Sequence, residues 1–254
     1  MDKIGYTGAV RGTFPLPFPT PMRPTPNDLS FNLFGFPTSI QPFFWLIAGL
    51  ITALNAGPIN DNMPLWILCL LFGMAGVLLS ILVHELGHAF SFRYLFNVPC
   101  AIVLHGFGGA AIPQQHYQRS YGVCGVAMNC FLSFSGPLAG FALAFVMFVL
   151  LLAIQPAAAS PFHFFLWWTM FISIFWGIIN LLPIYPMDGG HIAREAFLFF
   201  FPRRGVEYSL LFSIGTAVVL GIAAFLLLGQ IFIALFFGFF AYQNYQELSF
   251  GGVR

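Results

Sequence analysis

The chain has 254 residues, of which 59% are hydrophobic and only 7% charged, with a formal net charge of +1. Soluble domains carry about a quarter charged residues, so this composition excludes a water-soluble globular protein and indicates an integral membrane protein. The nearly neutral balance also lacks the excess of positive charge that binds phosphate backbones, so no nucleic-acid partner is expected.

The first 39 residues are polar and rich in proline, most densely at Leu16–Pro26. Alternating prolines favour an extended chain over packed structure, so a flexible cytosolic tail is predicted for residues 1–39. A secretory signal peptide needs a basic start followed directly by an apolar core, and this stretch has none. Residues 40–247 are predicted to form one membrane domain, and 248–254 a short cytosolic tail.

Six apolar segments follow the tail, each long enough or nearly long enough to cross about 30 Å of hydrocarbon as a helix. They are predicted at 40–56, 64–94, 123–154, 162–182, 206–228 and 230–247. Between the second and third, Val98–Pro113 mixes β-branched residues with glycines, which predicts short strands or a hairpin. The expected fold class is all-α: a polytopic membrane protein with six transmembrane helices and a small membrane-associated β-hairpin between helices 2 and 3.

The positive charges support this count. With six spans, every Lys and Arg falls in regions that share one side of the membrane: the two tails and the loops after the second and fourth spans. These residues are Lys3, Arg11, Arg23, Arg93, Arg119, Arg194, Arg203, Arg204 and Arg254. Because positive residues accumulate on the cytosolic side, both termini of this multi-pass protein are predicted to be cytosolic.

The second apolar segment ends in the sequence HELGH, His84–His88. Residues four apart project from one face of a helix, so His84 and His88 can bind the same metal ion, and Glu85 is placed to take a proton from water at the metal. Ionisable groups inside an apolar span are expensive, which indicates a functional site. The alternative is two core histidines hydrogen-bonded to their neighbours, beside an unrelated glutamate.

Catalytic zinc needs three protein ligands and one open position, so a third ligand is required. Asp188 has the most unusual setting among the other acidic residues, because two prolines and two glycines interrupt the helix within Asn180–Gly190. The alternative is a polar turn that leaves the membrane. The predicted topology decides between them, since it places His84 and Asp188 at one depth, toward the cytosolic side. One Zn²⁺ per chain is therefore expected.

Three motifs in the same order resemble the site-2 protease family of intramembrane zinc metallopeptidases, across about residues 64–195. They are HELGH (84–88), SGPLAG (Ser135–Gly140) and NLLPIYPMDGG (Asn180–Gly190). The resemblance implies that His84, His88 and Asp188 bind zinc and that Glu85 is the catalytic base. It implies a compact form of the family, because no insertion the size of a PDZ domain lies between the spans and no CBS domain is expected.

The resemblance also implies roles in substrate handling. Asn180 matches a family position implicated in holding substrate or stabilising the oxyanion, and the hairpin resembles the region to which substrate adds as an extended strand. Gly106, Gly108 and Gly109 are the candidate substrate-binding residues there. The expected reaction is hydrolysis of a peptide bond in or near the transmembrane segment of a single-span membrane protein, in the bilayer, as in regulated intramembrane proteolysis.

Two positions depart from the family pattern. Gly140 stands where many relatives have Asn, and His191 where relatives often have Arg. A catalytically silent member that binds metal or protein is the alternative function, although a pure binding site needs no base such as Glu85. A membrane di-iron enzyme is disfavoured because it requires repeated histidine boxes, and this chain has six scattered histidines. The oligomeric state is not defined by the sequence.

Overall fold

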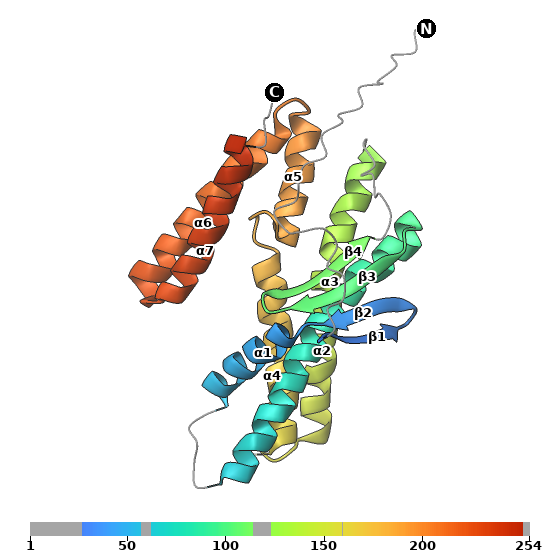
Figure 1. The fold of residues 1–254 in the computed structure, drawn as a ribbon, viewed down its shortest axis with the longest axis vertical. Helices are drawn as coiled ribbons and strands as arrows, with labels where there is room; N and C mark the ends of the chain where they lie inside the picture. The colour runs from blue at the N-terminus through green and yellow to red at the C-terminus, as the bar shows by residue number, and fades with distance from the viewer. Residues whose placement is uncertain (1–26, 57–61, 114–122, 159, 251–254) are drawn as a thin grey trace.

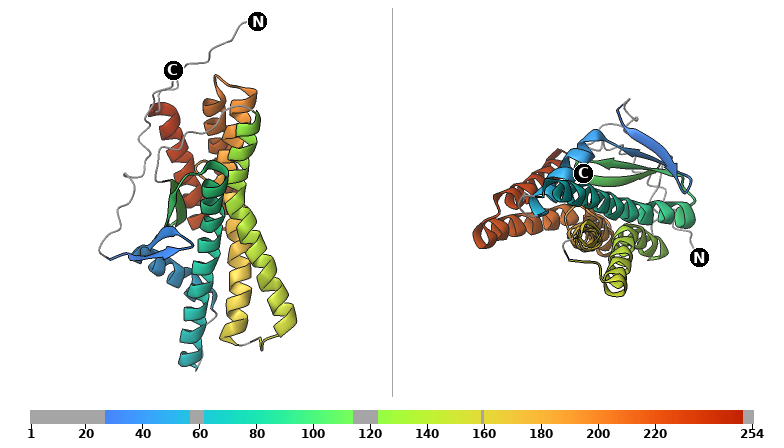
Figure 2. Two further views of the ribbon diagram at one scale, coloured as in Figure 1. Left: turned by 90° about the vertical axis from the view of Figure 1, so that its right-hand side faces the viewer. Right: turned by 90° about the horizontal axis from the view of Figure 1, so that it is seen from below.

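The computed structural model describes residues 27–56, 62–113, 123–158 and 160–250. Helices α2, α3 and α4 form the centre, a small sheet lies against α2, and α6 and α7 stand as a pair beside α5 (Figure 1; Figure 2). In chain order the elements are β1 (Leu29–Leu33), β2 (Phe36–Ile40), α1 (Pro42–Asn55), α2 (Met63–Phe96), β3 (Cys100–His105), β4 (Gly108–Pro113), α3 (Val123–Ile154), α4 (Pro161–Asn180), α5 (Asp188–Phe200), α6 (Gly205–Leu228) and α7 (Ile231–Phe250).

Local signals set the ends of the long helices. The Asn62 side chain accepts a hydrogen bond from the Leu65 N–H and caps the start of α2, whose first turn contains a proline. At its other end Asn97 adopts a left-handed conformation with φ of 51° and stops the helix. Ser160 caps α4 in the same way by accepting from the His163 N–H.

Within the described residues, four helices are long and apolar enough to cross a membrane: α2, α3, α4 and α6. Helix α1 has 14 residues, which gives about 21 Å, less than the hydrocarbon thickness of about 30 Å. Helix α7 has 20 residues, but polar side chains interrupt its second half. The chain is thus a multi-pass, mostly helical membrane protein, and the predicted count of six spans is not confirmed.

A further helix lies where the sequence analysis expects only a loop. Helix α4 ends at Asn180, a short turn follows, and α5 then begins at Asp188 and continues toward the same end of the molecule (Figure 1). Helix α5 has only 13 residues of mixed polarity. It is therefore too short and too polar to be recognised as a transmembrane helix from hydropathy. The structure therefore puts Asp188 at the start of a helix.

The predicted hairpin is confirmed and belongs to a larger sheet. Strands β3 and β4 pair antiparallel, from Cys100 opposite Pro113 to His105 opposite Gly108. The sheet has the order β1-β2-β3-β4, in which β2 and β3 are parallel. Strand β3 thus has a neighbour on both sides, whereas β4 forms an edge of the sheet.

The first two strands correct the predicted tail. The composition predicts a flexible tail up to residue 39, but β1 and β2 form an antiparallel hairpin through a turn at Phe34 and Gly35, both with positive φ. Arg93 of α2 donates to the carbonyls of Phe34 and Gly35, both at 2.9 Å, which ties this turn to the helix. The proline density concealed the short alternating pattern. Residues 1–26 and 251–254 lie outside the described residues.

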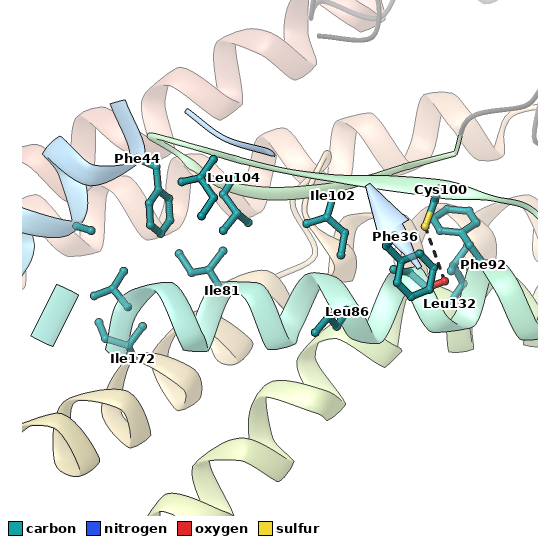
Figure 3. Close-up of a cluster of buried hydrophobic side chains, with 14 of the residues drawn as sticks. Phe36, Phe44, Ile81, Leu86, Phe92, Cys100, Ile102, Leu104, Leu132 and Ile172 are labelled. Atoms are coloured by element: carbon teal, nitrogen blue, oxygen red, sulfur yellow. Dashed lines mark hydrogen bonds between the residues drawn. The ribbon is translucent and has the colours of Figure 1, made fainter. Parts of the chain in front are cut away.

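An apolar cluster fastens the sheet to α2. Phe36 and Ile40 of β2 and Ile102 and Leu104 of β3 are buried. They pack with residues of α1, α2 and α4, such as Ile81, and Figure 3 shows these side chains between the sheet and the helix. Because the burial of each such side chain contributes about 1.5–3 kcal/mol, the sheet is held firmly against the helix that bears HELGH.

Candidate metal centre

Two elements bring His84, His88 and Asp188 together. The histidines lie one turn apart on α2, and Asp188 opens α5. Their Nε2 atoms are 3.3 Å apart; His84 Nε2 lies 3.2 Å from Asp188 Oδ2, and His88 Nε2 lies 3.2 Å from Asp188 Oδ1. The three side chains thus form a compact group of possible metal ligands, largely shielded from solvent.

These distances match a tetrahedral zinc site. Nitrogen and oxygen ligands bind zinc at about 2.0–2.2 Å, so neighbouring corners of the tetrahedron lie about 3.3 Å apart. Two histidines and one carboxylate also form a donor set of the kind found in catalytic zinc sites, which keep a fourth position open. The residues therefore fit a zinc ion in both chemistry and spacing.

The hydrogen bonds of His88 give independent support for a cation. Its Nδ1 lies 2.8 Å from the carbonyl oxygen of Leu132 in α3. A carbonyl can only accept, so Nδ1 carries a proton, and the neutral form of the ring has its lone pair at Nε2. That lone pair faces His84 Nε2 and the carboxylate of Asp188, whose buried Oδ2 accepts no hydrogen bond in the described part of the chain. A cation bound between these atoms would satisfy all of them together.

Glu85 lies on the sheet side of the same helix and is buried. The backbone of Ala111 in β4 hydrogen-bonds its carboxyl group. A Cβ added to Gly109 would come within 2.4 Å of Glu85 Cγ and 2.7 Å of its Oε1. The close approach of β4 to Glu85 thus depends on the missing side chain at Gly109.

Gly136 has the corresponding role for His88. A Cβ at this position in α3 would lie 2.2 Å from His88 Nε2 and 2.6 Å from Cε1. Helix α3 can carry the Leu132 carbonyl and the His88 ring side by side only because Gly136 has no side chain. In the sequence this glycine is marked only by its place in the small-residue motif SGPLAG, which does not reveal its contact with His88. At Gly140 a Cβ would be 4.0 Å from His84 Nδ1, so the position adjoins the other ligand.

The turn before α5 places Asp188. Cβ atoms at Gly189 and Gly190 would meet the backbone of Leu181 at 2.1 Å and of Tyr185 at 2.4 Å. The first turn of α5 therefore lies directly on the chain that leaves α4. Asp188 itself stands at the helix N-terminus, where the helix dipole favours a negative charge.

The other predicted residues lie around this centre with different contacts. Asn180 is in the last turn of α4 and donates to the carbonyl of Trp176 at 2.9 Å. Added Cβ atoms at Gly106 and Gly108 would meet the rings of Phe43 and Trp176, so close packing accounts for both glycines. His191 packs edge-on against Tyr185, and the described free cysteines are Cys69, Cys100 and Cys130.

Comparisons with known proteins show what the chain is similar to. The profile of Peptidase family M50 matches residues 152–222, which include Asp188. Over 160 residues the chain is 30% identical to Stage IV sporulation protein FB of Bacillus subtilis, covering 60% of this chain and 45% of that protein. Over 172 residues it is 27% identical to a putative zinc metalloprotease of Synechocystis, covering 65% of this chain and 42% of that protein. The chain thus spans less than half the length of these curated relatives.

A solved structure shares the fold. The site-2 protease from Methanocaldococcus jannaschii matches with a TM-score of 0.55 and 21% identity, over 87% of this chain and 95% of its own. The apolar helices and the His–His–Asp cluster define the class: a membrane protein with a metallopeptidase-like site. Together with these matches, they make the chain similar to peptidase family M50, the site-2 protease family, over the residues matched. The resemblance seen in the three motifs is confirmed.

Proposed function

We propose that this protein is a zinc endopeptidase that hydrolyses a peptide bond in or near the transmembrane segment of a single-span membrane protein. The observation that carries the proposal is a buried His–His–Asp cluster with tetrahedral spacing and a buried glutamate, Glu85, adjacent to one of its members. A site that only bound metal would need no such base.

In this proposal His84, His88 and Asp188 hold one zinc ion per chain. A zinc ion bound there supplies Lewis acidity, which polarises a carbonyl and lowers the pKa of a water ligand to about 7. Asp188 adds the negative charge of the ligand set, and the Leu132 carbonyl fixes the His88 ring in the tautomer that a metal ligand needs.

Glu85 is the proton carrier in the proposed reaction. Its carboxylate takes a proton from the attacking water as the C–O bond forms, and returns it to the amide nitrogen as the C–N bond breaks. Asn180 is proposed to stabilise the developing oxyanion, or to hold substrate. Its position at the end of α4, just before the turn that leads to Asp188, supports that role.

The substrate is proposed to add to the sheet at β4. A transmembrane helix hides its peptide bonds in internal hydrogen bonds, so the segment must unwind, and its backbone groups then need partners in lipid. Strand β3 is flanked by β2 and β4, so β4 offers the open edge next to Glu85 among the described strands. Gly108 and Gly109 belong to this strand, and substrates with helix-weak residues near the cut should be preferred.

We further infer the predicted orientation, with both termini and the active site toward the cytosol. The Lys and Arg residues within the described part of the chain are Arg93, Arg194, Arg203 and Arg204. Arg93 lies in the last turn of α2, Arg194 in α5, and Arg203 and Arg204 between α5 and α6, so none lies at the start of α2 or α4, which agrees with the positive-inside rule. In this arrangement the six proposed spans are α1, α2, α3, α4, α6 and α7, of which α1 is the shortest.

Metal removal tests the proposed function. The protein is reconstituted in vesicles with a panel of single-span peptides, some with Gly, Asn or Pro within the span and some with uniform Leu. Wild type is expected to cleave the first group, to lose cleavage on chelation and to regain it with one equivalent of zinc, since the ligands form one site. Cleavage fragments are identified by mass spectrometry. A wild type that holds zinc yet cleaves none of the panel would favour the silent binding module instead.

Gly109→Ala is expected to lower cleavage by about 10-fold or more while zinc content stays near one per chain. The added methyl group displaces Glu85, whose side chain provides all three of its nearest atoms. Zinc content by elemental analysis and cleavage rate are measured on the same sample. Ala110→Ser on the same strand is the control, because its side chain points to the opposite face. Unchanged cleavage by Gly109→Ala would contradict the role given to Glu85.

A further inference from the structure

The turn that carries Asp188 is held by the last two helices through one residue, Tyr185. Ser213 of α6 accepts a hydrogen bond from the Tyr185 N–H at 3.1 Å. Asn244 of α7 donates to the Tyr185 carbonyl at 2.6 Å. Both side chains are at most 1% exposed, so these hydrogen bonds form out of contact with solvent. The backbone of Tyr185 is therefore fixed on both its polar groups by elements far away in the sequence.

The ring of Tyr185 is held as firmly as its backbone. The guanidinium carbon of Arg194 in α5 lies 3.7 Å from the ring centroid. Arg194 in turn donates to Glu247 of α7 at 3.0 Å. Helix α5 thus contacts the ring of Tyr185 through Arg194, and the ion pair between Arg194 and Glu247 links α5 to α7.

The path from Tyr185 to Asp188 is short and rigid. Only Pro186 and Met187 lie between them, and within the turn the Met187 N–H donates to the carbonyl of Ile184 at 2.8 Å. Ile184 and Met187 are buried against α6 and α7 in a second apolar cluster. Gly190, two residues after Asp188, leaves no space between α5 and the Tyr185 backbone. A displacement of Tyr185 must therefore move the Asp188 carboxylate.

Asn244 is suited to this task by its two amide hydrogens. One is donated to the Tyr185 carbonyl and the other to the carbonyl of Phe240 in its own helix, at 2.8 Å. The amide is thereby oriented by α7 before it reaches the turn. An apolar side chain at this position would leave the Tyr185 carbonyl without a partner in buried surroundings.

We propose that Asn244 is a positioning residue for the metal site: by fixing the Tyr185 backbone, α7 sets the place of the Asp188 carboxylate relative to His84 and His88. This inference rests on the proposed zinc site, and it assigns the α6–α7 pair a part in metal binding although it contributes no ligand. The state of α7 is then coupled to the affinity of the site for metal.

Metal affinity in the full-length protein tests the proposal, independently of any substrate. Asn244→Leu is expected to weaken zinc binding by about 10–100-fold, as loss of an outer hydrogen bond to a metal site does. It is also expected to change the visible absorption of the Co²⁺-substituted protein, which reports ligand geometry. Zinc affinity is measured by competition with a chromophoric chelator. Gln246→Leu is the matched control: it removes an amide hydrogen bond to Tyr242 on an exposed face of the same helix.

Ser213→Ala provides a second, milder variant, which removes the other hydrogen bond of Tyr185 and should shift both readouts in the same direction. It decides the matter if Asn244→Leu does not fold. The proposal is overturned if Asn244→Leu, or Ser213→Ala where Asn244→Leu does not fold, is folded and shows zinc affinity within about twofold of wild type and an unchanged Co²⁺ spectrum. A lowered melting temperature alone does not support the proposal. Failure of the proposed function would appear differently, as normal metal binding by wild type without cleavage.

Discussion

Glu85→Gln is expected to retain one zinc ion per chain and to lose cleavage by about 10²–10⁴-fold, the usual contribution of a general base. The substitution keeps the size and hydrogen-bonding shape of a buried side chain but removes its ability to accept a proton. None of the three proposed ligands is altered. Cleavage of the reconstituted peptide panel and zinc content are measured on the same preparation. Cleavage is expected to fall while zinc content stays at the wild-type level.

The control is Glu207→Gln, in the first turn of α6, where the same chemical change lies outside the site. It should leave both quantities unchanged. Equal cleavage by Glu85→Gln and wild type would contradict the role of Glu85. Loss of zinc from Glu85→Gln would instead show that this residue belongs to the metal-binding group, and the assignment of the ligands would have to change.

Gly136→Ala is expected to abolish both zinc binding and cleavage. The new methyl group would lie 2.2 Å from His88 Nε2, the atom proposed to bind the metal. The ring cannot move aside without breaking its hydrogen bond to the Leu132 carbonyl, and a ligand that rotates away leaves only two donors. Because catalytic zinc sites use three protein ligands, affinity should fall by at least about 100-fold.

The matched control for this variant is Gly215→Ala in α6, where an added Cβ has nothing within 4 Å. Both substitutions replace a helical glycine by alanine, which raises helix propensity by about 1 kcal/mol. A difference between them therefore reports the contact with His88. If Gly136→Ala binds zinc as tightly as the control, His88 is not held as the structure has it, or is not a ligand.

The two glycine variants separate the parts of the site. Gly109→Ala acts on the base and should spare the metal, whereas Gly136→Ala acts on a ligand and should remove it. A single defect common to both would indicate general damage to the fold. Two distinct outcomes would support separate roles for Glu85 and His88.

Local pattern was sufficient for part of this protein. The composition by itself determined the membrane environment, and the four-residue spacing in HELGH determined that His84 and His88 share a face of one helix. The glycine-broken apolar stretch after it predicted the β3–β4 hairpin. These features depend on neighbours within a few residues of each other, so the sequence carries them directly.

The tertiary structure decided what depends on distant segments. Gly109 and Gly136 acquire their roles from the approach of β4 and α3 to the HELGH helix, and no local pattern states which side chain a glycine will face. The same holds for the β1–β2 hairpin, which joins the sheet through the pairing of β2 with the distant strand β3. Asn244 and Tyr185 are 59 positions apart and meet only because α7 folds back onto the turn before Asp188. The periodicity of the sequence indicates which face of a helix or strand a residue occupies. Only the tertiary packing determines which other residues that face contacts.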